Sequence, residues 1–145
     1  MMSEGKLIDT GTPFGKTADR RLRTERIAWL TTTAGDGTPQ PNAIWFLWDG
    51  DTVLMYSIPN QAKLKNIARN PRVSLNLDTR KSGDSVVILT GTAAVDPDVV
   101  PLHKNRAYLA KYRTEIARLG LGTPAKMAAE YSVAVRISPG KLRGF

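Results

Sequence analysis

The chain has 145 residues, 41% of them hydrophobic and 23% charged, which is enough for one compact domain and too apolar for a disordered segment. It contains no cysteine and a single histidine, which excludes disulfide frameworks, cysteine nucleophiles and metal sites built from Cys or several His ligands. The 21 basic residues outnumber the 13 acidic ones, and the net charge of +8 favours an anionic partner such as a nucleic acid, a membrane surface or an acidic small molecule.

Residues 1–15 are predicted to form a flexible arm, because they combine three glycines and Pro13 with few apolar residues. They include no apolar stretch typical of a signal peptide, and the longest apolar run of the chain is too short to cross a bilayer. We therefore expect a cytoplasmic protein with one domain over residues 16–145. Its first element is a short helix capped by Thr17 or Asp19.

Three strands and two tight turns come next in the sequence. The segments 27–33, 40–48 and 52–57 are rich in β-branched and aromatic residues, which is typical of strands. Between them, Asp36-Gly37 and Asp49-Gly50-Asp51 supply the residues that hairpin turns need at positive φ.

A helix and an alternating strand follow. Apolar residues recur at helical spacing between Asn60, a good N-cap, and Asn70-Pro71, which stops a helix. Residues 72–77 then alternate between apolar and polar side chains and predict a half-buried strand.

The last third of the chain combines two strands with helices. Strands are expected over 85–95, interrupted by Gly91, and over 132–137, while Thr123-Pro124 starts a short helix. About six strands joined mainly by hairpin connections indicate a mainly β fold, an antiparallel barrel or strongly curled sheet with peripheral helices. A longer helix opens after Asp96-Pro97-Asp98, and its apolar stripe comprises Tyr108, Leu109, Tyr112, Ile116 and Leu119.

The sequence shows no constellation that would transfer protons or attack a carbonyl on its own. It contains no phosphate-loop pattern, dinucleotide fingerprint or HExxH motif. The acid pairs Asp49/Asp51 and Asp96/Asp98 fit turns and caps better than a general acid–base couple. His103 fits a solvated or hydrogen-bonded side chain better than a catalytic one. If the protein is an enzyme, a cofactor supplies the reactivity.

The strand-to-helix corner 56–63 is a candidate anion site. The first turn of a helix offers unpaired N–H groups and the positive end of the helix dipole. Lys63 lies in this turn, where a cation is unfavourable unless an anion docks between its ammonium group and the amides. Ser57 and Gln61 can add hydrogen bonds to such an anion. The alternative is a solvated lysine on an ordinary amphipathic helix.

Two further features are candidates for ligand contact. Arg80-Lys81 and the arginines between residues 20 and 26 can form a rim that attracts anions. The run 43–48 is apolar throughout, so both of its faces must be covered, one by the core and the other by a second subunit, a flat ligand or more core. Trp45 and Phe46 point to opposite faces, so at most one of them lines a ligand. Aromatic residues interleaved with the basic ones are not evident, which favours a small anion over a nucleic acid.

Several segments taken together carry a family resemblance. They are Ile27-Ala-Trp-Leu-Thr-Thr32, Gly37-Thr-Pro-Gln-Pro-Asn42, Ile44-Trp-Phe-Leu-Trp-Asp-Gly50, Tyr56-Ser-Ile-Pro-Asn-Gln-Ala-Lys-Leu-Lys-Asn66, Asn70-Pro-Arg-Val-Ser-Leu75 and Leu142-Arg-Gly-Phe145. Over nearly the whole chain, this pattern resembles the pyridoxamine-phosphate-oxidase-like split β-barrel superfamily. It is most similar to the branch that uses the deazaflavin F420, the flavin/deazaflavin oxidoreductase B group.

The resemblance implies a homodimer of six-stranded split barrels that binds two cofactors in clefts between the subunits. The tail ending at Phe145 is a candidate to close the partner's cleft. The family's vitamin-B6 oxidases hold the phosphate with additional basic residues, whereas Ala62-Lys63 follows the deazaflavin pattern. The resemblance implies that the phosphate and ribityl part is held by Tyr56, Ser57, Gln61, Ala62 and Lys63, and that the ring is flanked by Gln40, Asn42, Ile44 and Trp45.

The resulting expectation is an F420-dependent oxidoreductase that passes hydride from the reduced cofactor to an unsaturated or heterocyclic small molecule. F420 carries a phosphodiester and a polyglutamate tail, so the net charge of +8, with Lys63, Arg80 and Lys81 near the site, favours it over FMN. Two alternatives stay open: an FMN-binding oxidoreductase of the same fold, and a non-catalytic carrier of F420 or haem. No metal, nucleic-acid or membrane partner is expected.

Overall fold

The computed structural model describes residues 6–79 and 82–145 of the chain. The helices are α1 (Pro13–Thr24), α2 (Ala62–Arg69), the 3-10 helix η2 (Leu102–Lys104), α3 (Arg106–Arg118) and α4 (Pro124–Glu130). The strands are β1 (Ala28–Thr33), β2 (Pro39–Ile44), β3 (Leu47–Trp48), β4 (Val53–Ser57), β5 (Arg72–Leu77), β6 (Val87–Val95) and β7 (Val133–Gly144).

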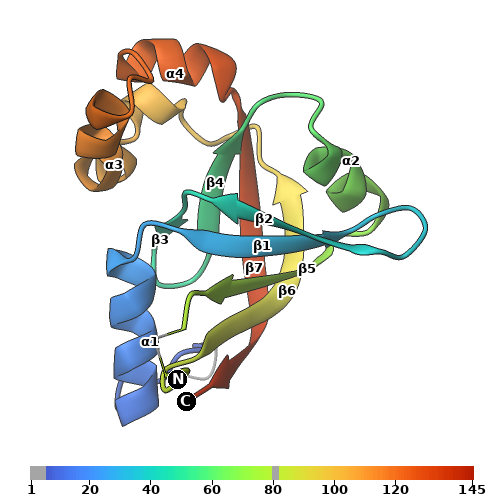
Figure 1. The fold of residues 1–145 in the computed structure, drawn as a ribbon, viewed down its shortest axis with the longest axis vertical. Coiled ribbons are helices and arrows are strands. Elements are labelled where there is room, and N and C mark those ends of the chain that lie inside the picture. The colour runs from blue at the N-terminus through green and yellow to red at the C-terminus, as the bar shows by residue number, and fades with distance from the viewer. Residues whose placement is uncertain (1–5, 80–81) are drawn as a thin grey trace.

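The predicted mainly β architecture is confirmed, but the sheet has seven strands rather than six. All strands pair antiparallel in the order β2-β1-β5-β6-β7-β4-β3, and the sheet curls strongly, with the helices at its periphery (Figure 1). The edge strands β2 and β3 are consecutive in the chain. The chain therefore passes directly from one edge of the sheet to the other, which is the geometry of a split barrel.

The extra strand arises because the predicted strand 40–48 is broken at Trp45-Phe46. At the break, the backbone N–H of Phe46 donates to the hydroxyl of Tyr112 (2.9 Å) and its carbonyl accepts from Lys111 Nζ (2.9 Å). Side chains of α3 thus replace the missing ladder bonds. Trp45 packs against the helices while Phe46 is buried in the barrel core, which confirms that the two residues point to opposite faces.

The predicted start of the first helix was wrong. Helix α1 begins at Pro13, where the fixed φ of proline suits a first helical residue, and Thr12 is its N-cap. Thr17 and Asp19 lie inside the helix. The end of the predicted arm thus forms the first turn of α1, and Ile8 packs into the core. Residues 1–5 of that arm lie outside the described residues.

The predicted cap of α2 was also wrong. Asn60 adopts φ 65, a left-handed conformation that asparagine tolerates in turns, and the N-cap is Gln61. The Gln61 side chain makes no capping hydrogen bond, so the first-turn N–H groups of α2 have no side-chain partner at the helix start.

Strand β4 is buried on both faces, because a hydrophobic cluster packs against each of them. Val53 and Met55 belong to the barrel core, which α1 and α2 help to close. Leu54 and Tyr56 belong to a second cluster formed with η2, α3 and α4. The α3–α4 hairpin, residues 106–130, is therefore fixed to the outer face of β4.

Most other predicted elements agree with the structure. Strand β5 covers 72–77 as expected, and Thr123 caps α4 by accepting a hydrogen bond from the N–H of Lys126. In the apolar stripe of α3 only Leu119 is exposed, because it lies at the C-cap, beyond the last helical turn. None of the helices in the described part of the chain has the length and hydropathy that a transmembrane span requires.

Candidate functional site

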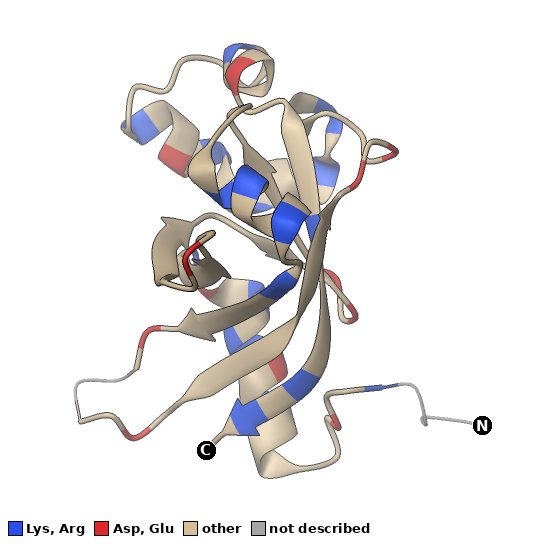
Figure 2. Cartoon of the chain, turned by 90° about the vertical axis from the view of Figure 1, so that its right-hand side faces the viewer, with Lys and Arg blue, Asp and Glu red and all other residues tan. Residues whose placement is uncertain are grey.

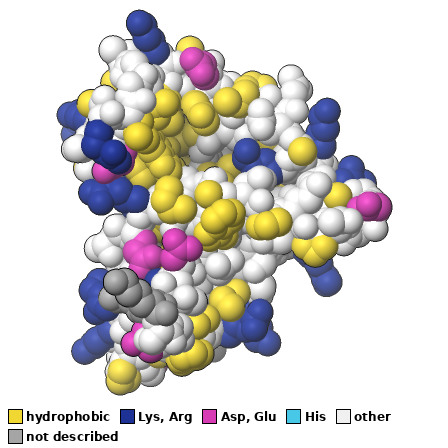
Figure 3. All heavy atoms as spheres, viewed as in Figure 1, with side chains coloured by type: hydrophobic (Ala, Val, Ile, Leu, Met, Phe, Trp, Pro, Cys, Tyr) yellow, Lys and Arg dark blue, Asp and Glu magenta, His cyan; other side chains and the backbone are white. Residues whose placement is uncertain are grey.

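A cavity of about 320 Å³ lies between the β4–α2 corner and the α3–α4 hairpin. Figure 3 shows hydrophobic side chains gathered in a hollow beside these helices. The structure brings six of the predicted site residues together here: Ile44, Trp45, Tyr56, Ser57, Gln61 and Lys63. The rest of the lining comes from Ala43, Met55, Ile58, Tyr108, Leu121, Met127 and Tyr131.

Lys63 is the cation of this lining, and no carboxylate of the described residues compensates its charge. Its side chain is half-buried, and burial lowers the pKa of its ammonium group. Among residues 6–79 and 82–145, no carboxylate lies within ion-pair distance of it. It sits in the uncapped first turn of α2, next to Gln61, and shares the lining with Ser57, whose hydroxyl is buried and donates to the carbonyl of Ile58 (2.9 Å). The corner therefore presents donors and a positive charge to the cavity, as an anion site requires.

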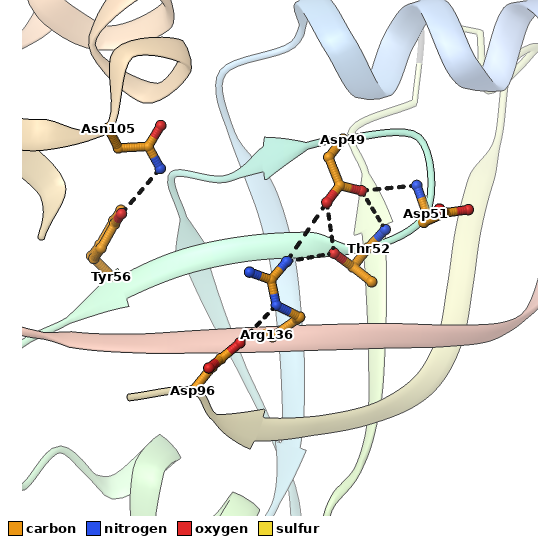
Figure 4. Close-up of polar contacts among 7 residues, drawn as sticks. All are labelled: Asp49, Asp51, Thr52, Tyr56, Asp96, Asn105 and Arg136. Atoms are coloured by element: carbon orange, nitrogen blue, oxygen red, sulfur yellow. Dashed lines mark hydrogen bonds and ion pairs between the residues drawn. The ribbon is translucent and has the colours of Figure 1, made fainter. Parts of the chain in front are cut away.

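Tyr56 is an aromatic residue of the cavity lining, and its hydroxyl is engaged in hydrogen bonds to residues outside the lining. The hydroxyl donates to the carbonyl of Val100 (2.8 Å) and accepts from Asn105 Nδ2 (3.0 Å), the second contact being visible in Figure 4. Burial raises the pKa of Tyr56, so the hydroxyl keeps its proton. The ring also meets Tyr108 edge-on, with 5.1 Å between centroids. A ligand in the cavity thus meets an aromatic surface here.

Trp45 forms an aromatic wall that α3 supports from behind. Its indole stacks on Tyr112 with 4.6 Å between centroids and 6° between planes. The adjacent Lys111 Nζ lies 3.8 Å from the centroid of the Phe46 ring. Burial, with a smaller contribution from nearby Arg26, lowers the pKa of Lys111 to about 8. Lys111 and Tyr112 thus fix the backbone that carries Trp45.

Three predicted site residues lie outside the cavity lining. Gln40 Oε1 accepts a hydrogen bond from Asn66 Nδ2 (2.7 Å), which ties β2 to α2. Asn42 is exposed on β2, and Ala62 is exposed at the start of α2. Arg80 and Lys81 lie outside the described residues.

The predicted rim of arginines is not a uniform basic surface. Arg21 is buried, where its guanidinium donates to Glu25 and to backbone carbonyls on both sides of the β5–β6 connection. Arg23 and Arg26 each pair with a carboxylate. The prediction for Arg21 was wrong because charge alone does not show which helix face is buried.

The two acid pairs are turn residues, as predicted. Asp49 accepts from the backbone N–H groups of Asp51 (2.9 Å) and Thr52 (2.7 Å), and Asp96 accepts from that of Asp98 (3.1 Å). Arg136 joins the two turns by bonding Asp96, Thr52 and Asp49 (Figure 4). The carboxylates of Asp49 and Asp96 therefore tie the β3–β4 turn and the end of β6 to Arg136 on β7.

His103 lies in η2, away from the cavity described above. It borders a second, larger cavity of about 680 Å³ with mostly apolar walls. Its Nδ1 is buried and makes no hydrogen bond within the described part of the chain, so the expectation of a solvated or hydrogen-bonded ring does not hold for this nitrogen. Among the described residues, no three His, Asp or Glu side chains are grouped as metal ligands would be.

The residues that α3, α4 and their connection add to the cavity were not predicted from the sequence. Tyr108 belongs to an apolar helical stripe, and such a stripe indicates a buried face without showing what lies opposite. Helix α4 contains Met127, and Tyr131 directly follows it, while Leu121 lies in the connection between α3 and α4. Only the contact of the hairpin with β4 brings them to the site.

Comparison with known proteins agrees with this fold. A solved structure named F420 reductase is 26% identical, with a TM-score of 0.65, over 86% of this chain and 94% of that one. A conserved hypothetical protein from Mycobacterium tuberculosis is 25% identical, with a TM-score of 0.67, over 100% of this chain and 85% of that one. An FAD-binding protein from Mesorhizobium loti, 21% identical with a TM-score of 0.65 over 89% of this chain and 91% of that one, shares the fold.

Among curated proteins, none matches the sequence significantly. The family model described as pyridoxamine 5'-phosphate oxidase, in contrast, matches residues 14–144, which is nearly the whole chain. This protein therefore belongs to the pyridoxamine 5'-phosphate oxidase family.

Proposed function

We propose that this protein binds F420 in the cavity beside Lys63 and transfers hydride from the reduced cofactor to an unsaturated or heterocyclic small molecule. The observation that carries the proposal is the half-buried Lys63 ammonium group, which has no acidic partner in the described structure and faces a cavity with aromatic walls. Desolvating an unpaired charge costs free energy. A phosphate bound at this corner would offset that cost.

The residues present fit such a cofactor at both ends. Lys63, Gln61 and the backbone amides of Ala62 and Lys63 at the start of α2 would hold the phosphate. Ile44 at the end of β2 and Trp45 at the break that follows it would flank the ring. When bound, the deazaflavin supplies the hydride chemistry, which agrees with the engagement of both acid pairs in turns. The tasks left to the protein are to orient the two reactants and to exclude water.

Two observations favour F420 over a flavin. The net charge is +8, and Figure 2 shows basic residues on α1, α2 and the C-terminal part of β7, so the field of the whole molecule attracts the more anionic cofactor. One similar structure is named an F420 reductase. The second candidate is an FMN- or FAD-dependent oxidoreductase, which the family and the FAD-binding neighbour support.

A homodimer with the cofactor at the interface is part of the proposal. The cavity opens to the surface in the hollow that Figure 3 shows, and a second copy of the chain would cover a cofactor lying there. Sedimentation velocity should give twice the mass of the chain.

The test is a titration of cofactor-free protein with F420 and with FMN. Wild-type protein should bind F420 more tightly than FMN. Because one charge-assisted contact contributes about 1.5–3 kcal/mol, Lys63→Ala should weaken F420 binding about ten- to hundredfold. Lys65→Ala is the matched control, since this exposed lysine lies on the same helix outside the cavity lining. It should change the dissociation constant less than about twofold.

Equal F420 affinity in wild-type protein and Lys63→Ala would overturn the site. Tighter binding of FMN would favour the flavin alternative. Oxidation of reduced F420 in the presence of a panel of unsaturated acceptors then separates an enzyme from a carrier, because a carrier binds the reduced cofactor without ever passing on its hydride.

A further inference from the structure

We propose that the apolar end of the same cavity binds an uncharged, flat acceptor, and that Leu121 determines which acceptors fit. Describing the ligand as an acceptor rests on the proposed function, whereas its binding is a separate property that can be measured without a cofactor.

The two ends of the cavity differ in chemistry. The polar side chains of the lining, Ser57, Gln61 and Lys63, belong to the end of β4 and the start of α2, and α2 lies on the other side of β4 from the α3–α4 hairpin (Figure 1). No charged side chain of the described lining lies at the hairpin end. A carboxylate placed there would lose its hydration without gaining a partner. The residues at this end are Trp45, Tyr108, Leu121, Met127 and Tyr131.

The support behind Trp45 favours a flat ligand. One face of its indole is covered by Tyr112 at 4.6 Å, nearly parallel, while the residue also lines the cavity. The Tyr112 hydroxyl accepts from the N–H of Phe46 (2.9 Å), which fixes the neighbouring backbone. The wall is therefore ordered before a ligand arrives. A planar ring can stack on such a surface without the entropic cost of ordering the indole side chain.

Leu121 occupies the boundary between the cavity and solvent. It lies in the α3–α4 connection between Gly120 (φ 68) and Gly122 (φ 84), two left-handed positions that favour glycine. This backbone directs Leu121 to the cavity lining, although 37% of the residue remains exposed. Leu119, in the same connection, is 52% exposed and outside the lining. Leu121 thus sets the size of the opening, and Leu119 is its matched control.

The test uses two probes of the same shape, naphthalene-2-carboxamide and naphthalene-2-carboxylate, titrated by calorimetry into cofactor-free protein. The carboxamide should bind, and Leu121→Ala should weaken it about three- to tenfold because part of a leucine contact is lost. Leu121→Met, which keeps the apolar volume, should retain wild-type affinity. Leu119→Ala should change the affinity less than about twofold.

The charged probe separates the two ends of the cavity. In wild-type protein the carboxylate can pair with Lys63, so the comparison is made in Lys63→Ala. There the carboxylate should bind at least about tenfold more weakly than the carboxamide, although the net charge of the protein favours the anion. Carboxamide affinity itself should change less than about twofold on Lys63→Ala.

Three results would overturn the inference: no carboxamide binding, equal effects of Leu121→Ala and Leu119→Ala, or an equally tight carboxylate in Lys63→Ala. The outcome is independent of the cofactor titration. Carboxamide binding that depends on Leu121, together with no F420 binding, would reject the proposed function and leave a site for flat apolar ligands. F420 binding that depends on Lys63, together with no carboxamide binding, would reject the acceptor site and leave the cofactor site.

Discussion

Tyr112 closes the break between β2 and β3 with a single hydroxyl group. The hydroxyl accepts a hydrogen bond from the N–H of Phe46 (2.9 Å). It also lies within donating distance of the carbonyl of Arg26 (2.7 Å) and the carbonyl of Phe46 (3.0 Å). The residue is fully buried, and burial raises the pKa of its hydroxyl, so this donor stays protonated at neutral pH. Without the hydroxyl, the N–H of Phe46 would be buried and unpaired.

Tyr112→Phe should lower the free energy of unfolding by about 1–3 kcal/mol, the cost of leaving a buried backbone donor without its partner. Urea denaturation of both proteins measures this difference. Tyr131→Phe is the control, because the Tyr131 hydroxyl makes no hydrogen bond within the described part of the chain, and it should change stability by less than about 0.5 kcal/mol. Equal losses in the two variants would contradict the role given to Tyr112.

At the scale of single residues, local chemistry predicted some site residues and missed others. Lys63 could be predicted as a ligand-binding residue because a cation is unfavourable in the first turn of a helix. In the structure it lines a cavity and has no acidic partner among the described residues. Tyr108 and Leu121 did not stand out, because their contribution depends on where α3 and α4 pack. Nothing in the residues themselves distinguishes a leucine that borders a cavity from one in solvent.

At the scale of elements, the β6–β7 pairing contains an irregularity that requires glycine. The register shifts between Thr90 and Gly91, and a Cβ added at Gly91 would lie 2.1 Å from the carbonyl oxygen of Ser138 and 2.7 Å from Cα of Pro139. Both contacts are with backbone atoms, which cannot move aside as a flexible side chain can. The approach of the two backbones allows long strands to bend within the curled sheet.

Gly91→Ala should therefore destabilise the protein by at least about 2–3 kcal/mol, because one of the two strands must shift. The matched control is Gly140→Ala on the facing strand, where the nearest atom to an added Cβ is 3.9 Å away, an ordinary contact distance. Thermal unfolding should show a clear loss in Gly91→Ala and a small change in Gly140→Ala. A similar transition temperature for the two variants would show that β6 and β7 relax around the new methyl group.

Element boundaries were predictable where a local pattern determines them. Strand β5 alternates strictly and ends where the alternation ends, because one of its faces is buried. The strand predicted over 40–48 lacks such a limit, since its apolar run continues across the break. The break depends on Tyr112, which is 66 residues away in the sequence from Phe46. A local sequence pattern cannot indicate a contact between residues so far apart in the chain. For this reason the seventh strand was not predicted from the sequence.

At the scale of the whole molecule, electrostatic attraction acts before any specific contact forms. The described ion pairs involve Arg21, Arg23, Arg26 and Arg136, so most of the 21 basic residues of the chain have no acidic partner in this set. Their combined field raises the local concentration of anions around the molecule without choosing among them. Specificity is left to the cavity, where Lys63 supplies a charge at one end and aromatic rings supply a surface at the other.

This division of roles predicts how salt changes affinity. Between about 0.1 and 1 M salt, the Debye length falls from about 10 Å to about 3 Å, which removes the long-range field and preserves close contacts. F420 binding should weaken about tenfold over this range, and FMN, with fewer charges, should weaken less. The neutral naphthalene-2-carboxamide should show no loss, because its binding depends on apolar burial alone. Calorimetric titration of the three ligands at each salt concentration measures the trend. A salt dependence that is equal for F420 and FMN would show that only the shared phosphate contact at Lys63 matters, and that the remaining charge of the protein has no part in selecting the cofactor.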